Sequence, residues 1–170
     1  MDQPLATTMP LVGDEAPDFS IRDDRGHQQR LADQRGRWIV LYFYPKDDTA
    51  GCTVEACEFR DADAQFGAYR AVVWGVSPQG TDSKAAFRAK FELPFNLLAD
   101  EDHAVAEAYG TWVLKENNGK TYWGVQRSTF LIDPDGRVAH VWPRVKPEGH
   151  AADVLAAIEA GVSTTGQTAG

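Results

Sequence analysis

The sequence predicts an α/β layer sandwich with a mixed β-sheet, and three observations lead to this fold class. Short, strongly apolar segments typical of buried strands alternate with segments of helical periodicity. Near the end of the chain, a strong turn sequence joins two strands as a hairpin, which adds antiparallel pairing to the sheet. The length of 170 residues suits one domain with its own core, and no internal repeat or linker divides it.

The chain opens with an irregular lead-in and a first buried strand. Residues up to about Pro17 carry no periodic pattern, residues 19–22 read as a short strand, and residues 23–26 carry turn chemistry. Residues 38–43 are almost continuously apolar, β-branched or aromatic, which is how a strand buried on both faces reads. Pro45 then ends this strand, because proline has no N–H for the sheet.

A helix is expected to begin at Cys52. Cys52, Phe59 and Phe66 recur at seven-residue steps, which places Cys52 at the head of the buried face. The helix is expected to end near Gly67. Cys57 lies about 140° around the helix from Cys52, at roughly 100° per residue.

The middle of the chain continues the alternation. Residues 71–76 form a second buried strand, and residues 83–91 suit a helix that Pro94 ends. A short strand at residues 96–98 and a helix at residues 104–109 are expected to follow.

The next segment reads as a loop flanked by aromatic residues. Residues 114–120 contain Asn117–Gly119, which is typical of a turn or loop. We expect Trp112, Tyr122 and Trp123 to be core residues, and the alternative is that they line an apolar approach to the cleft.

The chain closes with a hairpin and a helix. Residues 128–132 and 138–142 are strands joined by the turn Asp133–Gly136. Pro147 suits the first turn of a last helix, and the tail from Gly161 is expected to fray. The apolar stripe of this helix consists of Ala151, Val154, Leu155 and Ile158.

Composition excludes several classes of function. The 17 basic and 25 acidic residues give a formal net charge of −8, and no basic stripe with interleaved aromatics suggests a nucleic-acid surface. Residues 1–16 lack the basic start and apolar core of a signal peptide, and no apolar run approaches the ~20 residues of a membrane span. A cytoplasmic protein is therefore expected. In that reducing compartment, two close cysteines are more often catalytic, redox-sensing or metal-binding than a permanent crosslink.

The four histidines carry no metal-site pattern. His27, His103, His140 and His150 are scattered without paired ligand spacing. With two cysteines five residues apart, they do not resemble a structural zinc site. We expect all four to be surface or packing residues.

A cysteine at a helix start has a chemical use. The unpaired N–H groups and the macrodipole of the first turn favour the thiolate, which is the nucleophilic form. A helix end supplies only about 0.3–2 kcal/mol, so a nearby cation is needed as well. Lys46 is a local candidate, but it lies in a loop beside Asp47 and Asp48. Arg127 is better placed at the mouth of a strand, because strand ends surround the sites of α/β folds.

Two further expectations concern this helix. Asp47, Asp48 and Glu55 would oppose a thiolate if they came close, and we expect them to point outward. Residues five apart on an ideal helix have Cα atoms about 8.6 Å apart, whereas a disulfide needs about 4.4–6.8 Å. Cys52 and Cys57 therefore either never pair, or pair only when the first turns unwind.

The spacing Pro45-x-x-x-Thr49-x-x-Cys52 resembles the active-site signature of peroxiredoxins. The longer surrounding string closely resembles the bacterioferritin-comigratory, or Q-type, subfamily, and the similarity runs over about residues 13–160. The matching segments are residues 16–19, 42–47, 51–61 and 127–133. The chain departs from the family at Ala50, where proline is usual, and the loop is expected to be more flexible for it.

The resemblance implies a thioredoxin-like three-layer sandwich with a central mixed β-sheet flanked by helices, as one domain over residues 1–170. It implies that Cys52 is the peroxidatic cysteine and that Cys57 is the resolving cysteine. Thr49 would hydrogen-bond the peroxide and the thiolate, Arg127 would complete that network, and Pro45 would shield the site. The simpler alternatives are a helix cap for Thr49, a surface ion pair for Arg127, a strand end for Pro45 and a spectator thiol for Cys57.

The implied activity is reduction of hydrogen peroxide and organic hydroperoxides through a sulfenic acid and an intramolecular disulfide. Thioredoxin or a similar dithiol would recycle the enzyme, and no metal, flavin or haem is required. A monomer is implied, with a dimer as the alternative. Two other function classes stay open: a redox sensor or holdase switched by the same disulfide, and a general disulfide oxidoreductase. The four-residue gap between the cysteines argues against the oxidoreductase, which usually uses Cys-x-x-Cys.

Overall fold

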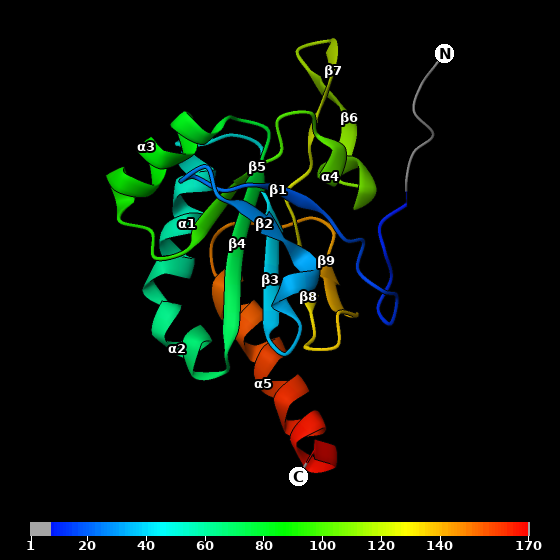
Figure 1. Ribbon diagram of the computed structural model, residues 1–170. Coiled ribbons are helices and arrows are strands. Elements are labelled where there is room, and N and C mark those ends of the chain that lie inside the picture. The colour runs from blue at the N-terminus through cyan, green and yellow to red at the C-terminus, as the bar shows by residue number, and fades with distance from the viewer. Residues whose placement is uncertain (1–7, 170) are drawn as a thin grey trace.

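The computed structural model describes residues 8–169, with side chains described as far as Gly161 (Figure 1). The strands are β1 (Ser20–Arg22), β2 (Gln28–Arg30), β3 (Trp38–Phe43), β4 (Ala71–Ser77), β5 (Asn96–Ala99), β6 (Trp112–Asn117), β7 (Lys120–Val125), β8 (Ser128–Ile132) and β9 (Val138–Trp142). The helices are the 3-10 helix η1 (Leu31–Gln34) and the α-helices α1 (Ala50–Asp61), α2 (Asp63–Ala68), α3 (Thr81–Phe91), α4 (Ala104–Ala108) and α5 (His150–Ala169).

The central sheet is mixed, as the sequence predicts. Its five strands lie in the order β5-β4-β3-β8-β9, and β3 pairs in parallel with β4 but antiparallel with β8. In the β3–β8 register, Phe43 lies opposite Ser128. The carboxyl end of β3 therefore lies beside the beginning of β8, and the loop after β3 comes next to Arg127.

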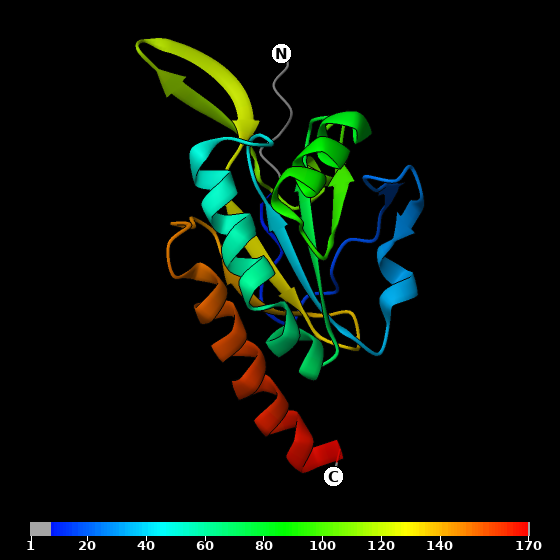
Figure 2. The same ribbon diagram turned by 90° about the vertical axis from the view of Figure 1, so that its left-hand side faces the viewer.

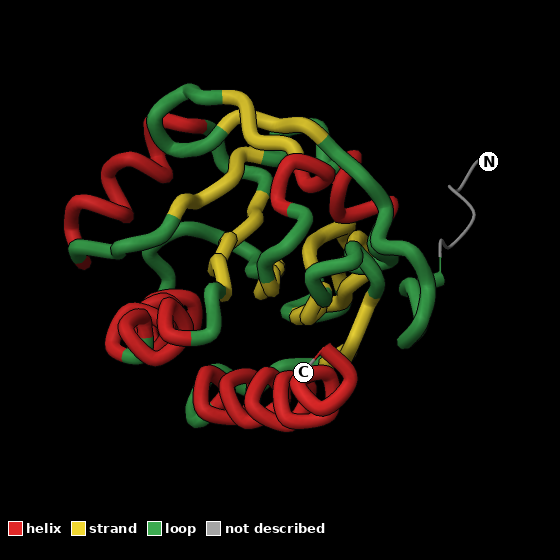
Figure 3. The backbone as a smooth tube through the Cα atoms, turned by 60° about the horizontal axis from the view of Figure 1, so that its bottom comes forward, coloured by secondary structure: helices red, strands yellow, loops and turns green. Residues whose placement is uncertain are grey.

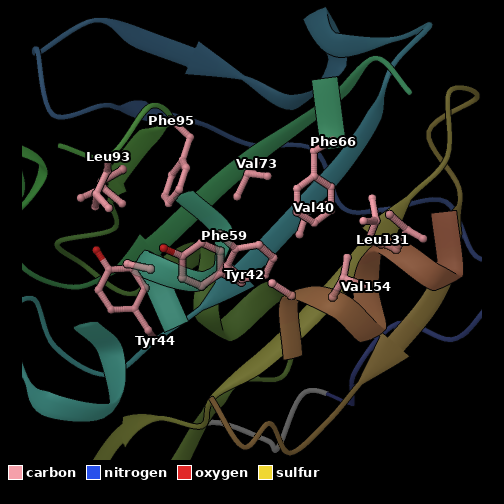
Figure 4. Packing of buried hydrophobic residues seen from close by; sticks show 14 of the residues in the cluster. Val40, Tyr42, Tyr44, Phe59, Phe66, Val73, Leu93, Phe95, Leu131 and Val154 are labelled. Atoms are coloured by element: carbon pink, nitrogen blue, oxygen red, sulfur yellow. The ribbon is translucent and has the colours of Figure 1, made fainter. Parts of the chain in front are cut away.

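Helices cover both faces of this sheet. Because successive strand residues point to opposite faces, Val40 and Tyr42 of β3 belong to one apolar cluster while Leu41 and Phe43 belong to another. The first cluster lies under α1 and α5, which run along the same face of the sheet (Figure 3), and Figure 4 shows Phe59 of α1 packed on Tyr42. The second cluster lies under α4 and the segment that precedes β3. These layers confirm the predicted three-layer sandwich.

The helix that carries the cysteines is shorter than predicted. The buried stripe of α1 includes Cys52, Ala56 and Phe59, as expected, but the helix ends at Asp61. Ala62 has φ −97° and ψ 5°, and a second helix, α2, then carries Phe66 into the core. The seven-residue spacing of apolar residues continues across this break, which is why the sequence suggests one helix.

The last helix also differs at its ends. Pro147 precedes α5 rather than lying in its first turn, because α5 begins at His150. At the other end, α5 continues to Ala169 through the segment where a frayed tail is expected. The four residues predicted for its apolar stripe are all buried.

Residues 114–120, predicted to be a turn or loop, belong to a hairpin of two strands. Strands β6 and β7 pair as a separate two-stranded sheet, and Asn118 and Gly119 at its tip have φ values of 55° and 79°. Positive φ at both central residues suits the tight turn of a two-residue hairpin. The hairpin projects beyond the layers of the domain, close to where α1 begins (Figure 2).

This projection makes the prediction of core positions for Tyr122 and Trp123 wrong. Tyr122 is 48% exposed and Trp123 is 36% exposed, because no layer packs over this part of the hairpin. Trp112 lies at the base of the hairpin and stacks on His103 with ring centroids 4.0 Å apart.

The histidines are surface or packing residues, as expected. His27 and His140 are exposed, and His103 is partly exposed in its stack with Trp112. His150 is buried at the start of α5, where its Nε2 lies 2.8 Å from Thr129 Oγ1.

Candidate active site

Cys52 is the third residue of α1 and is 1% exposed. Thr49 is the N-cap residue with extended backbone angles, and its carbonyl accepts the first helical hydrogen bond, from the N–H of Thr53. The first turn contains no acidic residue. The sulfur therefore lies where the helix end favours a negative charge, as the sequence predicts.

Arg127 contacts the sulfur directly. Its Nη2 donates to Cys52 Sγ at 3.2 Å, and its Nη1 donates to Glu55 Oε1 at 2.7 Å. Arg127 precedes β8, and its carbonyl accepts a hydrogen bond from the N–H of Val145 at 3.0 Å, which fixes its backbone. One guanidinium thus bridges the cysteine and a carboxylate. Its planar fork of donors suits this double contact.

The expectation that Glu55 points outward is wrong. Its side chain is fully buried beneath Arg127, because positions 52, 55, 56 and 59 share the inner face of α1. Burial raises the pKa of Glu55 to about 7, although Arg127 opposes this shift. Among the described residues, its second oxygen, Oε2, has no hydrogen-bond partner. Glu55 therefore has a pKa near neutral pH, and it is hydrogen-bonded to Arg127, the residue that contacts the sulfur.

The charge of Arg127 is maintained in this site. Burial alone would lower its pKa, but Glu55 and Cys52 together raise the pKa above its ordinary value. The guanidinium consequently stays protonated throughout the physiological range, and it supplies the cation that a helix end alone does not.

Gly51 makes room for this guanidinium. A Cβ atom at Gly51 would lie 3.2 Å from Arg127 Nη2 and 3.6 Å from Pro147 Cγ. The first distance is tighter than most Cβ contacts, so a larger residue would push the guanidinium away. The absence of a side chain at Gly51, directly before the cysteine, thus leaves the space in which Arg127 contacts Cys52.

Thr49 and Pro45 lie in the loop between β3 and α1, the helix that carries Cys52. Thr49 is exposed, and its hydroxyl donates to the carbonyl of Lys46 at 3.0 Å rather than capping α1 with its side chain. Pro45 is half-buried, and its carbonyl accepts a hydrogen bond from Gln79 Nε2 at 3.3 Å. Both residues are therefore near the helix start, but among the described side chains it is Arg127 that hydrogen-bonds the sulfur.

Cys57 is a free, partly buried thiol on the same unbroken helix as Cys52. Five helical residues separate their Cα atoms by about 8.6 Å, which is too far for a disulfide. In this conformation the two sulfurs are held apart, and pairing requires the first turns of α1 to unwind.

The two aspartates of the loop behave differently. Asp48 is exposed, as expected, and pairs with Lys90 at 2.8 Å. The same expectation is wrong for Asp47, which is 7% exposed and pairs with the fully buried Lys84 at 3.2 Å. Lys46, the alternative cation, is exposed.

Sequence reasoning missed Glu55, Gly51 and the Asp47–Lys84 pair. Glu55 had a detectable signal, since it lies three residues after Cys52 and so falls on the buried stripe of the helix. The other two depend on contacts with Arg127 and α3, which local patterns do not reveal.

Among the residues that the structure describes, no group of three or more His, Cys, Asp or Glu side chains is arranged to hold a metal ion. Within the same residues, no helix combines the length and the apolar character needed to cross a membrane.

Comparison with known proteins places this geometry in context. The sequence pattern described as the AhpC/TSA family matches residues 12–141. Peroxiredoxin Bcp of Bacillus subtilis is 49% identical over 144 residues, which cover 85% of this chain and 92% of that protein.

Two solved structures are also similar. A mutant of the peroxiredoxin Q from Xylella fastidiosa superposes with a TM-score of 0.85 at 34% identity, covering 90% of this chain and 98% of that one. The bacterioferritin comigratory protein of Xanthomonas campestris, in a study of its alkyl peroxide reduction activity, has a TM-score of 0.81 at 38% identity. The alignment covers 84% of this chain and 91% of the Xanthomonas chain.

Proposed function

Because the chain belongs to the AhpC/TSA family and is a peroxiredoxin of the Bcp/Q type, we propose that Cys52 is its peroxide-reducing cysteine and Cys57 its resolving cysteine. Peroxiredoxins are thiol peroxidases, so the reaction class follows from membership. The observation that most supports the assignment to Cys52 is the 3.2 Å contact between Arg127 Nη2 and its sulfur at the start of α1.

In the first step, the Cys52 thiolate attacks the terminal oxygen of the peroxide. A sulfur–oxygen bond forms, the O–O bond breaks, and the leaving oxygen takes a proton to become water or an alcohol. Arg127, with Thr49, stabilises the negative charge that develops across the breaking bond. Pro45 shields the sulfur from bulk water at the mouth of the site.

In the second step, the beginning of α1 unwinds and the Cys57 thiol attacks the sulfenic acid of Cys52. A disulfide forms and water leaves. The helical separation of the two cysteines supports the need for unwinding, because an intact α1 keeps their Cα atoms about 8.6 Å apart. A dithiol protein such as thioredoxin then reduces the disulfide by thiol–disulfide exchange.

The proposed substrates are hydrogen peroxide and organic hydroperoxides, and reduction of alkyl peroxides by the similar Xanthomonas protein supports the second class. We further infer that the chain acts as a single-domain monomer in the cytoplasm, with its core over about residues 13–160. Sedimentation of the reduced protein at micromolar concentration tests the monomer, and a dimer would contradict it.

Substitution of each cysteine tests the assignment. We expect Cys52→Ser to abolish peroxide consumption, because the nucleophile is lost. Cys57→Ser should still be oxidised once at Cys52 but should lose thioredoxin-driven turnover. Intact mass after one equivalent of peroxide should show a loss of two hydrogens per wild-type chain without a covalent dimer. Peroxide consumption by Cys52→Ser at the wild-type rate would refute the proposal.

A further inference from the structure

A buried polar cluster lies behind the loop that leads to Cys52, and the proposed mechanism does not use it. Its centre is Lys84 on α3, which is 0% exposed. The Lys84 ammonium donates to Asp47 Oδ1 at 3.2 Å, to Tyr44 Oη at 3.3 Å and to Ser77 Oγ. All three ammonium hydrogens therefore have acceptors.

Asp47 is held from several directions. Tyr44 Oη donates to its Oδ1 at 2.5 Å, and Ser83 Oγ donates to its Oδ2 at 2.7 Å. Its backbone N–H donates to Gln79 Oε1 at 3.0 Å. The carboxylate thus joins the loop after β3 to β4 and α3.

Gln79 links the hydrogen bonds around Asp47 to Pro45. Its Nε2 donates to the carbonyl of Pro45 at 3.3 Å, while its Oε1 also accepts from Ser77 Oγ at 2.7 Å. Two backbone groups of the loop, the Pro45 carbonyl and the Asp47 N–H, are consequently fixed by one side chain. The Lys46 carbonyl between them accepts the hydrogen bond from Thr49.

A buried ion pair of this kind is not explained by stability alone. Removing an ammonium and a carboxylate from water costs free energy that their attraction only partly restores, and apolar residues often fill such a site equally well. What the pair does supply is a single defined geometry, because every donor and acceptor around it must be matched.

We propose that Lys84 is a positioning residue for peroxide reduction, which through Asp47 holds the Pro45–Thr49 loop in the geometry that receives the peroxide beside Cys52. This role rests on the proposed function of Cys52. Among the described residues, Lys84 makes no hydrogen bond to the sulfur or to Pro45. It acts on the loop through Asp47, and its other hydrogen-bond partners, Tyr44 and Ser77, belong to the same buried cluster.

The exposed ion pair between the same loop and the same helix provides a matched control. Lys90 of α3 pairs with Asp48 at 2.8 Å, but its side chain is 59% exposed. A pair in water contributes little to a fixed geometry, since it is screened and both side chains are free to move. Lys90→Met therefore removes one lysine from α3 without releasing the buried hold on the loop.

The test compares Lys84→Met, Asp47→Asn, the double variant and Lys90→Met in a Cys57→Ser background. Stopped-flow mixing with hydrogen peroxide measures the second-order rate constant for oxidation of Cys52. Each buried variant should oxidise at least tenfold more slowly, and the double variant should be no slower than the singles, because all three release the same loop. Lys90→Met should match the background.

A second readout separates positioning from a general loss of structure or of charge. Alkylation of Cys52 by iodoacetamide reports the thiolate without requiring the peroxide geometry. In the charge-neutral double variant, the midpoint of its pH profile should stay unchanged while the peroxide rate constant falls. A shift of that midpoint large enough to account for the slower peroxide reaction would instead assign Lys84 a direct electrostatic action and overturn the proposal.

Ser83→Ala covers the case in which the charge variants fail to fold. It removes only the bond to Asp47 Oδ2, and it should lower the peroxide rate constant two- to fivefold with normal circular dichroism. Wild-type rates in Ser83→Ala and in every folded Lys84 or Asp47 variant would overturn the positioning role alone. Retention of activity in Cys52→Ser would instead overturn the proposed function, so the two failures are distinguishable.

Discussion

At the scale of single residues, the site depends on how one guanidinium is shared. Arg127 donates both to Cys52 and to Glu55, and the carboxylate competes with the sulfur for its charge. Since burial raises the pKa of Glu55 to about 7, the protonation of that carboxyl changes within the working pH range. The pair of contacts explains why a carboxylate is tolerated so close to Cys52: the carboxylate orients the arginine and is partly neutralised itself.

This raised pKa predicts a pH dependence of stability. The carboxyl of Glu55 binds a proton more tightly in the folded protein, with a pKa of about 7, than at the ordinary pKa of 4.5. Its contribution to the free energy of unfolding is therefore complete below about pH 4.5 and is lost as pH rises through 7. The difference corresponds to about 3 kcal/mol. In Glu55→Gln this dependence is absent, so the free energy of unfolding of the variant should rise relative to wild type between pH 5 and 8.

Urea unfolding at a series of pH values measures this difference. Glu116→Gln is the control, because it makes the same substitution at an exposed carboxylate on β6. A constant difference for Glu55→Gln across the same range would show that Glu55 is ionised throughout.

Gly51 gives a second prediction at this scale. Gly51→Ala adds a Cβ that would lie 3.2 Å from Arg127 Nη2, so the guanidinium must move away from Cys52. We expect the peroxide rate constant to fall about tenfold, equivalent to about 1.4 kcal/mol. Stability should be equal or higher by up to about 1 kcal/mol, since alanine favours the helix.

Gly67→Ala in α2 is the matched control, because a Cβ there meets no atom within 4 Å. It should share any gain in thermal stability while reacting with peroxide at the wild-type rate. An unchanged peroxide rate in Gly51→Ala would indicate that Arg127 tolerates the displacement.

At the scale of elements, the start of α5 is fixed by a buried imidazole. His150 contacts Thr129 of β8 at 2.8 Å and meets the rings of Phe59 and Trp142 edge-on. It therefore joins α5 to the sheet and to α1. Burial lowers the pKa of His150 to about 4, with Arg127 acting in the same direction and Asp153 opposing it.

The lowered pKa gives a prediction of the opposite sign to that of Glu55. The stability due to neutral His150 is complete above about pH 6.5 and is lost as pH falls through 4, a loss of about 3 kcal/mol. His150→Gln, which retains a hydrogen-bonding group, should lose less stability than wild type between pH 6.5 and 4. Thermal unfolding across that range measures it.

His140→Gln serves as the comparison for this series, because it makes the same substitution at an exposed histidine. If His150→Gln were as acid-sensitive as wild type, other groups would carry the acid transition.

The hairpin shows how an element escapes prediction. Among the described strands, β6 and β7 pair with each other and with no third strand. Their alternating pattern is weak because neither face is covered over most of its length. A strand that is not half-buried lacks the period-two alternation by which strands are recognised. The turn residues Asn118 and Gly119 were the available signal, and they identify the tip of the hairpin but not the strands on either side.

At the scale of the whole molecule, one sheet separates two apolar clusters and links them. Strand β3 sends alternate side chains into each cluster, so loss of either cluster removes half the packing of β3. Trp38 and Trp142 report on the first cluster, while Trp74 lies in the second. This sharing predicts that the clusters unfold together.

Urea unfolding followed by tryptophan fluorescence and by far-ultraviolet circular dichroism should therefore give coincident single transitions. The double variant Trp74→Phe/Trp112→Phe gives the sharper version, because it removes the tryptophans that pack in the second cluster. Its fluorescence midpoint should equal the dichroism midpoint of the same variant. Two separated transitions would divide the chain into independently stable parts and contradict the prediction of one domain.

The sequence by itself determined the fold class and the family, and it predicted the place of Cys52 at the head of α1. Strands β3, β8 and β9 have the bounds that apolar runs predict, and Cys52 begins the buried face of its helix because burial repeats with the helical period. These properties are local, so the order of residues is sufficient to reveal them.

Only the tertiary structure decided which charges meet. Glu55 and Asp47 were expected to face water, and they are buried against Arg127 and Lys84, which lie far from them in the sequence. The physical reason is that the pairing of β3 with β8 and the packing of α3 beside the loop bring these cations to the helix start. A carboxylate is buried where a cation is already in place, and no local pattern carries that information.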